Sequence, residues 1–573
     1  MKKKPEWMKD KKILRALAVP GALLLVLILA NMLFLEHWME SDFAAEMIFS
    51  KLLSETGHYI ASPDWYYSTE FRIFYTQLVM VPLFKIFRSW TVIRMLTNFV
   101  FYALMLWSYA FLVRPLKVPA TRKILASSLL LVPFSETMAQ HVHFGNTYIA
   151  HMILMFWVTG LVLRLADPSQ GAEAESCVAS DGTGKAADRA DLWQIWYLTA
   201  LTVLSLICGA SGVRYFLSVY GPLVLAGGFL MLQGRSFRVL LQSRAGDEKT
   251  LRQRLSEVGA AFRSPEGAIF RCSLGATLIA LIGYAFNVTY IRSHYSFTTY
   301  ENLNFIQVIN GELLLHLQNA FGSLLELLGY IPQKEVLGLR GLITVLSFAL
   351  LGIGAFVTWQ LSHRCRHRFG TSAGAQAERF FVYFFRAAFW LMTFFLVFTY
   401  TTITPRYYLL VLALFVPLVL IYDRHEDRWL QRSLVLGGLC LILLLTEGKI
   451  LYSMAGADKN AGRAQAAAFL EEKGYTFGYS TYEHANMLQE LSDGAVEAAG
   501  IILEDGGMRY FRWSSAEKYY EPGYAKGPVF LLLSEAESEK YADYDLLQQG
   551  GEIYREGGYV IYGYPDASPF AQE

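Results

Sequence analysis

The chain has 573 residues, of which 54% are hydrophobic and 17% charged, and its formal net charge is +1. This surplus of apolar residues excludes an ordinary soluble domain, because a water-soluble core cannot absorb it, and the balanced charge gives no reason to expect a nucleic-acid partner. Apolar runs of about 20 residues, the length that crosses a bilayer, predict a polytopic α-helical membrane protein with about 11 spans and a small C-terminal α/β domain.

The N-terminal segment is rich in lysine and precedes a long apolar run at residues 13–35. No small-residue cleavage site follows this run, so the sequence favours a retained first span over a cleaved signal peptide. The positive-inside rule places the basic N-terminus in the cytoplasm. Residues 36–72 hold seven acidic and two basic residues, so this loop is expected on the outer side.

The external loop, residues 36–91, is expected to bear interfacial helices. One helix is predicted to begin at Phe43, and a second amphipathic helix is expected over residues 70–87. Ser41 or Asp42 is suited to cap the first of these helices, which is the ordinary role of such side chains at a helix start.

The remaining apolar runs complete a transmembrane domain over residues 1–450. Between them, residues 166–192 are rich in Gly, Ala and Ser and indicate a cytoplasmic low-complexity linker. The loop over residues 235–271 carries eight Lys and Arg residues and is also expected inside. The expected spans lie near residues 92–113, 123–139, 148–165, 192–210, 213–232, 272–291, 342–361, 380–400, 407–421 and 434–445.

Residues 455–573 hold twenty acidic and nine basic residues and no cysteine, which suits an extracytoplasmic domain. Helical spacing is expected at 461–473 and 483–491, and strands at 476–479, 529–533 and 559–564. The aromatic cluster from Tyr510 to Trp513 is suited to stacking on a sugar, although such clusters more often form a core or an interfacial anchor.

On this topology, unusual polar side chains share the outer ends of the spans. His141 and His143 are two residues apart and cannot share a helix face, so without a third ligand they do not predict a metal site. Arg214 and Arg406 suit either headgroup anchors or anion ligands. Neither hairpin span beside Arg406 contains an acid, so its guanidinium is expected to lack a carboxylate partner and to bind a phosphate. The set of outer polar residues is Glu40, Asp42, His141, His143, Asn146, Arg214, Arg406 and Tyr407.

Several of these segments together resemble the GT-C superfamily of membrane glycosyltransferases, in particular the bacterial protein mannosyltransferase and lipid A aminoarabinose transferase group, which is family 39-like. The resemblance covers most of the chain by pattern rather than by identity. It is carried by Glu40-Ser-Asp-Phe-Ala-Ala-Glu46, Pro63-Asp-Trp-Tyr-Tyr67, His143-Phe-Gly-Asn-Thr-Tyr-Ile-Ala-His151, Gly212-Val-Arg-Tyr215, Pro405-Arg-Tyr-Tyr408 and Gly478-Tyr-Ser-Thr-Tyr-Glu-His-Ala-Asn486.

The resemblance implies an enzyme that transfers a sugar from a polyprenyl-phosphate carrier to a glycan, lipid or protein acceptor on the outer face of the plasma membrane. An acid of the first external loop is then the general base, with Asp42 the first choice and Glu40 the second, because the family carries adjacent acids or Asp-x-Asp where this chain has Glu-x-Asp. Arg214 and Arg406 match positions that hold the carrier phosphate. No cofactor is implied, although a divalent metal is compatible with the site.

Two other classes of protein remain open from the sequence. A transporter or flippase would place charged residues near the middle of its spans and often carry repeated, broken helices. A noncatalytic membrane scaffold would use the C-terminal domain to bind a partner. The clustering of charges at span ends favours the enzyme, and the sequence names neither the sugar nor the acceptor.

Overall fold

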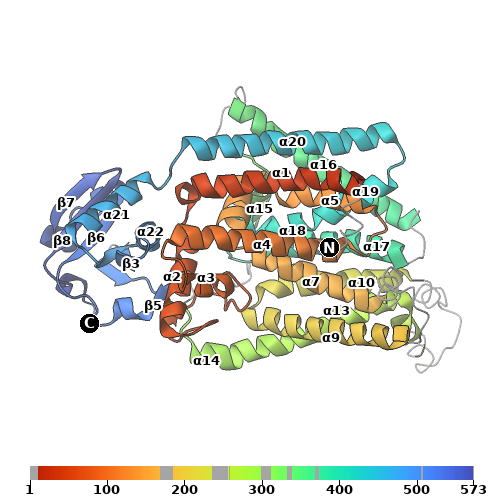
Figure 1. Cartoon of the computed structure of the whole chain (residues 1–573), viewed down its shortest axis with the longest axis horizontal. Coiled ribbons are helices and arrows are strands. Elements are labelled where there is room, and N and C mark those ends of the chain that lie inside the picture. The colour runs from red at the N-terminus through yellow and green to blue at the C-terminus, as the bar shows by residue number, and fades with distance from the viewer. Residues whose placement is uncertain are drawn as a thin grey trace, which may run out of the picture.

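The computed structural model describes residues 11–167, 185–234, 256, 259–298, 311–331, 339–367, 373–504 and 507–571. The described chain forms a long helical bundle with a small α/β domain at one end, which we call the domain end (Figure 1). This architecture confirms the predicted class, a polytopic helical protein with a C-terminal α/β domain.

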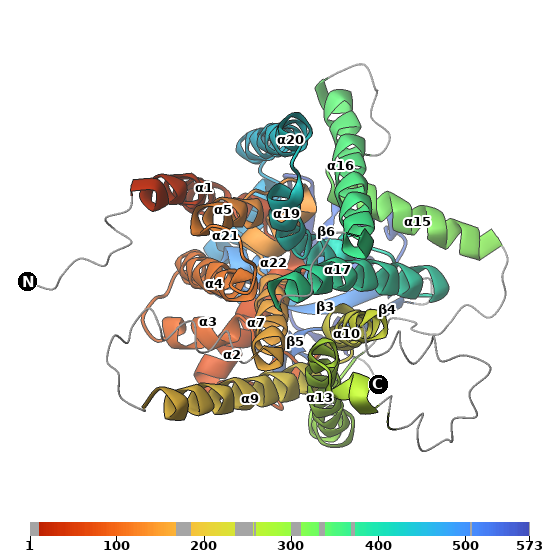
Figure 2. The same cartoon turned by 90° about the vertical axis from the view of Figure 1, so that its right-hand side faces the viewer.

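The described residues contain ten segments that are long and apolar enough to cross a membrane. Viewed along the bundle, α15 and α16 lie at one edge, and α9 and α13 pack together at another (Figure 2). The long helices are α1 (Lys11–Phe34), α4 (Trp90–Val113), α7 (Ile149–Ala166), α9 (Lys185–Ser211), α10 (Gly221–Gln233), α13 (Pro265–Phe286), α15 (Gly311–Leu327), α16 (Leu339–His367), α17 (Ala373–Phe398), α19 (Phe415–His425) and α20 (Trp429–Gly456).

A further crossing of the bundle is made by short pieces. The predicted span at 123–139 is instead α5 (Ala120–Ser127), a 3-10 turn, α6 (Glu136–Met138) and a π-helical turn over Ala139–Phe144. Lys123 donates to the Arg114 carbonyl at the far end of α4, whereas Glu136 pairs with Lys459 at the domain end, so the segment does traverse the bundle. Pro133 explains the break, because its ring and missing N–H interrupt a helix. This crossing and the ten continuous candidates agree with the prediction of about 11 spans.

The first loop folds across the domain end of the bundle. It contains α2 (Ser41–Thr56), the short strand β1 (Trp65–Tyr66) and α3 (Gln77–Phe84). The predicted helix over 70–87 is therefore wrong in its first turns, where residues 70–76 form irregular chain. Glu70 and Arg72 in this stretch form the ion pairs described below, so tertiary contacts override the helical pattern.

The C-terminal domain is a mixed sheet of six strands in the order β4-β3-β2-β6-β8-β7. Strand β2 pairs in parallel with β3 and β6, and the other pairs are antiparallel. The predicted helix at 461–473 and strand at 559–564 are confirmed, whereas β3, β4 and β7 were not predicted. The elements are α21 (Ala461–Lys473), β2 (Phe477–Thr481), α22 (Tyr482–Leu491), β3 (Glu497–Glu504), β4 (Gly507–Tyr510), β6 (Val529–Ser534), α23 (Glu535–Lys540), α24 (Asp545–Gln549), β7 (Gly551–Glu556) and β8 (Tyr559–Tyr564).

The domain is docked on the bundle by specific contacts rather than tethered by α20 alone. Strand β1 of the first loop pairs with β5 (Ser515–Ala516) of the domain. Arg94 of α4 and Glu490 of α22 form an ion pair at 3.0 Å, with 1% and 5% of the two side chains exposed. Because both charges are removed from water, they hold the two parts in one relative position.

The predicted linker over 166–192 lies mostly outside the described residues. Its last residues, from Lys185, belong to α9. Helix α20 ends at Gly456, so residues 450 and 455 lie in its last two turns, and residues 457–460 lead into α21.

Replacement of Glu490 by alanine should weaken the docking, since it leaves the Arg94 guanidinium buried without its carboxylate. The expected loss is about 3–5 kcal/mol, seen as a lower thermal midpoint in detergent and faster proteolytic release of the domain. Glu552→Ala breaks an exposed pair with Arg555 and serves as the control, with little or no change in the thermal midpoint expected. Equal behaviour of the two variants would contradict this account of the interface.

Candidate functional site

Asp42 lies at the start of α2, where the bundle, the first loop and the C-terminal domain meet. Arg406 of η7 (Pro405–Tyr408) donates from Nη1 to Oδ2 at 2.9 Å, and Tyr482 of α22 donates from Oη to Oδ1 at 2.9 Å. The side chains of Asp42 and Arg406 are 39% and 32% exposed, so the pair borders open space. The expectation that Arg406 lacks a carboxylate partner is wrong, because its partner comes from a segment 364 residues away in sequence.

The two candidate bases, Glu40 and Asp42, are in different protonation environments. Burial and the neighbouring Asp42 charge raise the pKa of Glu40 to about 7. Burial acts to raise the pKa of Asp42 as well, but the Arg406 charge and the Tyr482 hydroxyl hold it below its ordinary value. Asp42 is therefore ionised at neutral pH, and Glu40 is close to half protonated.

A second set of ion pairs follows the irregular chain after β1. Arg72 donates to Glu46 Oε1 at 2.7 Å, and its Nε lies 3.7 Å from Glu70 Oε2. Glu70 also pairs with Arg214 at 2.6 Å, while its second oxygen lacks a hydrogen-bond partner. Arg214, which was predicted to lie near Arg406, therefore joins the same region through Glu70.

Glu46 and Glu70 differ although both are buried. Burial raises the pKa of Glu46 to about 7, against the opposing charge of Arg72 and the hydroxyls of Tyr75 and Thr76. Burial acts in the same direction on Glu70, but the Arg214 charge lowers its pKa below the ordinary value. Glu46 is thus the carboxyl of this network that gains or loses a proton near neutral pH.

These side chains surround a polar cavity of about 110 Å³ at the domain end. The C-terminal domain supplies part of its wall through Trp513 and Ser514, and Ser514 has a positive φ of 47° that is unusual for a residue with a side chain. The lining residues that carry the argument are Asp42, Glu46, Glu70, Arg72, Tyr148, Arg214, Arg406, Tyr407 and Trp513.

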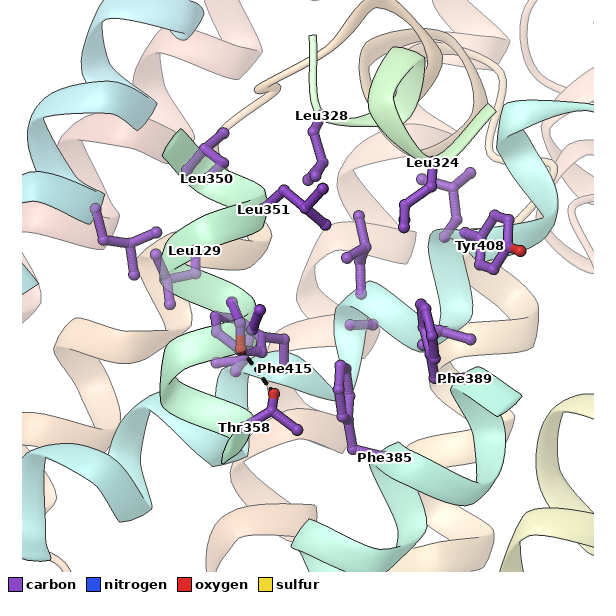
Figure 3. A pocket seen from close by; sticks show the side chains of 18 of the residues that line it. Leu129, Leu324, Leu328, Leu350, Leu351, Thr358, Phe385, Phe389, Tyr408 and Phe415 are labelled. Atoms are coloured by element: carbon purple, nitrogen blue, oxygen red, sulfur yellow. Dashed lines mark hydrogen bonds between the residues drawn. The ribbon is translucent and has the colours of Figure 1, made fainter. Parts of the chain in front are cut away.

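An apolar cavity of about 810 Å³ lies within the bundle (Figure 3). Tyr408 stands at one end, and Thr358 and Phe385 stand at the other. Arg406 and Tyr407 line the polar cavity, and the next two residues, Tyr408 and Leu409, line the apolar one. Four consecutive residues thus line both cavities, two in the polar one and two in the apolar one.

The histidines and the asparagine that were predicted to join the site have other surroundings. His141 is buried, with Nδ1 2.9 Å from Thr147 Oγ1. His143 lies 3.0 Å from the Leu130 carbonyl through Nε2, and Asn146, at φ 58°, donates to Asn98. None of the three is among the residues that line the polar cavity, and their contacts fix the turn that supports it.

Of the predicted site residues, the structure brings Asp42, Arg214, Arg406 and Tyr407 around one cavity, with Glu40 next to Asp42. Sequence reasoning missed Glu46, Glu70 and Arg72, although the acidic character of the first loop was a usable signal. It also missed Tyr482, for which the strand-to-helix junction near residue 481 was the available clue. Among the described residues, no group of three or more His, Cys, Asp or Glu side chains is placed to hold a metal ion.

No family model matches the sequence, and no curated protein matches it. Among the solved structures that match are two of ArnT from Cupriavidus metallidurans, which are similar over nearly the whole chain. The form bound to undecaprenyl phosphate has 10% identity and a TM-score of 0.47, with 94% of this chain and 97% of that chain covered. The apo form has 12% identity and a TM-score of 0.49, with 95% and 97% covered. At such low identity, the chemistry of this chain has to be argued from its own residues.

Proposed function

We propose that this chain is a membrane glycosyltransferase that moves a sugar from a polyprenyl-phosphate carrier to the hydroxyl of an acceptor, with Asp42 as the general base. The motifs quoted above, which resemble the GT-C superfamily, supply the reaction class. The geometry of the two adjoining cavities, which is formed by this chain's own residues, supports the same reaction.

The observation that carries the proposal is the junction at η7. A polyprenyl-phosphate sugar has a long apolar chain, one phosphodiester charge and a polar sugar. A charged chamber with guanidiniums next to an apolar cavity matches that order of groups, and Arg406 lies at the boundary where the phosphate would sit. An apolar cavity of about 810 Å³ has the size of a small-ligand site, so it suits only part of a long prenyl chain.

The charge of the polar cavity also suits a monoanion. When Glu46 is protonated, three guanidiniums face two carboxylates, and the cavity carries one net positive charge. A phosphodiester brings one negative charge, so its binding neutralises the site and favours the protonated form of Glu46. The groups counted are Arg72, Arg214 and Arg406 against Asp42 and Glu70.

In the reaction, the acceptor oxygen attacks the anomeric carbon as its proton passes to Asp42. The bond between that carbon and the phosphate oxygen breaks, and the carrier leaves as polyprenyl phosphate with the bonding electrons. The leaving group is a stabilised anion, so it needs the positive charge of Arg406 more than it needs a proton. A single base at Asp42 then suffices for the acid–base chemistry.

The ion pair between Asp42 and Arg406 suggests how donor binding prepares the base. When Arg406 binds the phosphate instead of Asp42, Asp42 loses the neighbouring positive charge that lowers its pKa. The basicity of Asp42 therefore rises. The pair is partly exposed, so separating it costs less than separating a fully buried pair. The same side chain therefore keeps Asp42 ionised before the donor arrives and holds the phosphate afterwards.

The first test is Asp42→Asn, which keeps the shape of the side chain but removes its basicity. Transfer from a polyprenyl-phosphate sugar should fall by about 100-fold or more, while expression and membrane insertion remain. Glu40→Gln is the matched control and should retain most of the activity, because Glu40 does not line the polar cavity. Full activity in Asp42→Asn with loss in Glu40→Gln would move the base to Glu40, and full activity in both would contradict the proposed reaction.

The orientation in the plasma membrane is part of the proposal. The basic N-terminus and the acidic, cysteine-free residues 455–573 support a cytoplasmic N-terminus and an extracytoplasmic C-terminal domain. Alkaline phosphatase joined to the C-terminus should be active, and a reporter that works only in the cytoplasm should be silent there. The opposite pattern would place the site on the cytoplasmic face and contradict transfer on the outer face.

A further inference from the structure

The C-terminal domain reaches the candidate base through one side chain. The Tyr482 hydroxyl donates to Asp42 Oδ1 at 2.9 Å, while Arg406 occupies Oδ2 at the same distance. The two oxygens of the carboxylate are thus held by different parts of the molecule. Only the Arg406 contact is released in the donor exchange proposed above, so the Tyr482 contact remains when the base acts.

Tyr482 is itself fixed from both sides of the interface. It is the first residue of α22, directly after the central strand β2, and its carbonyl accepts a hydrogen bond from Ser41 Oγ at 2.6 Å. Its ring meets that of Phe511 edge to face, with centroids 5.4 Å apart. Asn486 donates to Ser41 Oγ at 3.1 Å and closes the network around the residue that precedes Asp42. The hydroxyl therefore has little freedom to move relative to α2.

We propose that Tyr482 is a positioning residue of the transferase, which holds one oxygen of Asp42 so that the other faces the acceptor hydroxyl. The proposal rests on the function proposed above. The terminal torsion of a carboxylate is broad, so a carboxylate released by Arg406 would otherwise rotate among several orientations. A reacting group that is already held in its productive orientation reacts faster than one that must first be oriented. On this account the C-terminal domain is a part of the active site, and not only a binding module.

The test is Tyr482→Phe, which removes a single oxygen atom. We expect kcat to fall about ten-fold, as for the loss of a hydrogen bond to a charged group, with the KM for the lipid donor unchanged. A contact that serves only stability would lower the amount of folded protein and leave kcat per folded molecule as it was. Thermal midpoints of both proteins, measured in the same detergent, separate these two effects.

Tyr66→Phe is the matched control. Tyr66 donates to Glu517 Oε1 at 3.4 Å across the same interface, but it does not line the polar cavity. Its variant should keep the kcat of the parent. Phe511→Leu is a second probe, because it loosens the ring of Tyr482 without touching Asp42, and a smaller fall in kcat at unchanged KM is expected.

Two results would overturn the proposal. One is a kcat in Tyr482→Phe equal to that of the parent. The other is an equal loss in Tyr482→Phe and Tyr66→Phe, which would make the contact a general part of the interface. If Asp42→Asn is inactive while Tyr482→Phe is fully active, the proposed function stands and this inference fails. If Asp42→Asn is active, the proposed function fails first.

Discussion

The ion pair between Asp42 and Arg406 is the interaction on which the account of the site depends. It joins the first loop to the last hairpin of the bundle, and it stands at the boundary between a charged and an apolar cavity. The pair is partly exposed and separates at less cost than the buried pair of Arg94 and Glu490. The Arg94–Glu490 pair thus fixes the C-terminal domain on the bundle, whereas the Asp42–Arg406 pair at the site can be exchanged for a contact with an anion.

The other charges of the site fix the positions of the guanidiniums. Glu46 and Glu70 hold Arg72 between them, and Glu70 also holds Arg214. A guanidinium held in this way is already oriented when an anion arrives, so less conformational freedom is lost on binding. The raised pKa of Glu46 lets the cavity adjust its charge by one proton near neutral pH.

The sequence was sufficient for features that depend on local pattern. Apolar runs located α1, α4 and α17, and helical and alternating patterns located α21 and β8. It failed where distant segments decide the local structure. Pro133 divides one crossing into short pieces. Residues 70–76 are irregular rather than helical, because Glu70 and Arg72 form ion pairs with other segments.

The site shows the same difference between what local sequence indicates and what contacts between distant segments decide. Asp42 and Arg406 were each proposed from their position and from the family resemblance, but their contact was not foreseen, because it joins residues 364 positions apart. Tyr482 is 440 positions from Asp42, and its role depends on how the C-terminal sheet docks on the bundle. No periodicity or local motif encodes that docking, so these partners had to come from the structure.

The most direct test of the central claim is an experimental structure of the protein with polyprenyl phosphate bound. The account predicts that Arg406 leaves Asp42 and donates to the phosphate, that the start of the prenyl chain lies in the apolar cavity beside Tyr408, and that Asp42 keeps its contact with Tyr482. A phosphate bound elsewhere, with Arg406 still paired to Asp42, would contradict it.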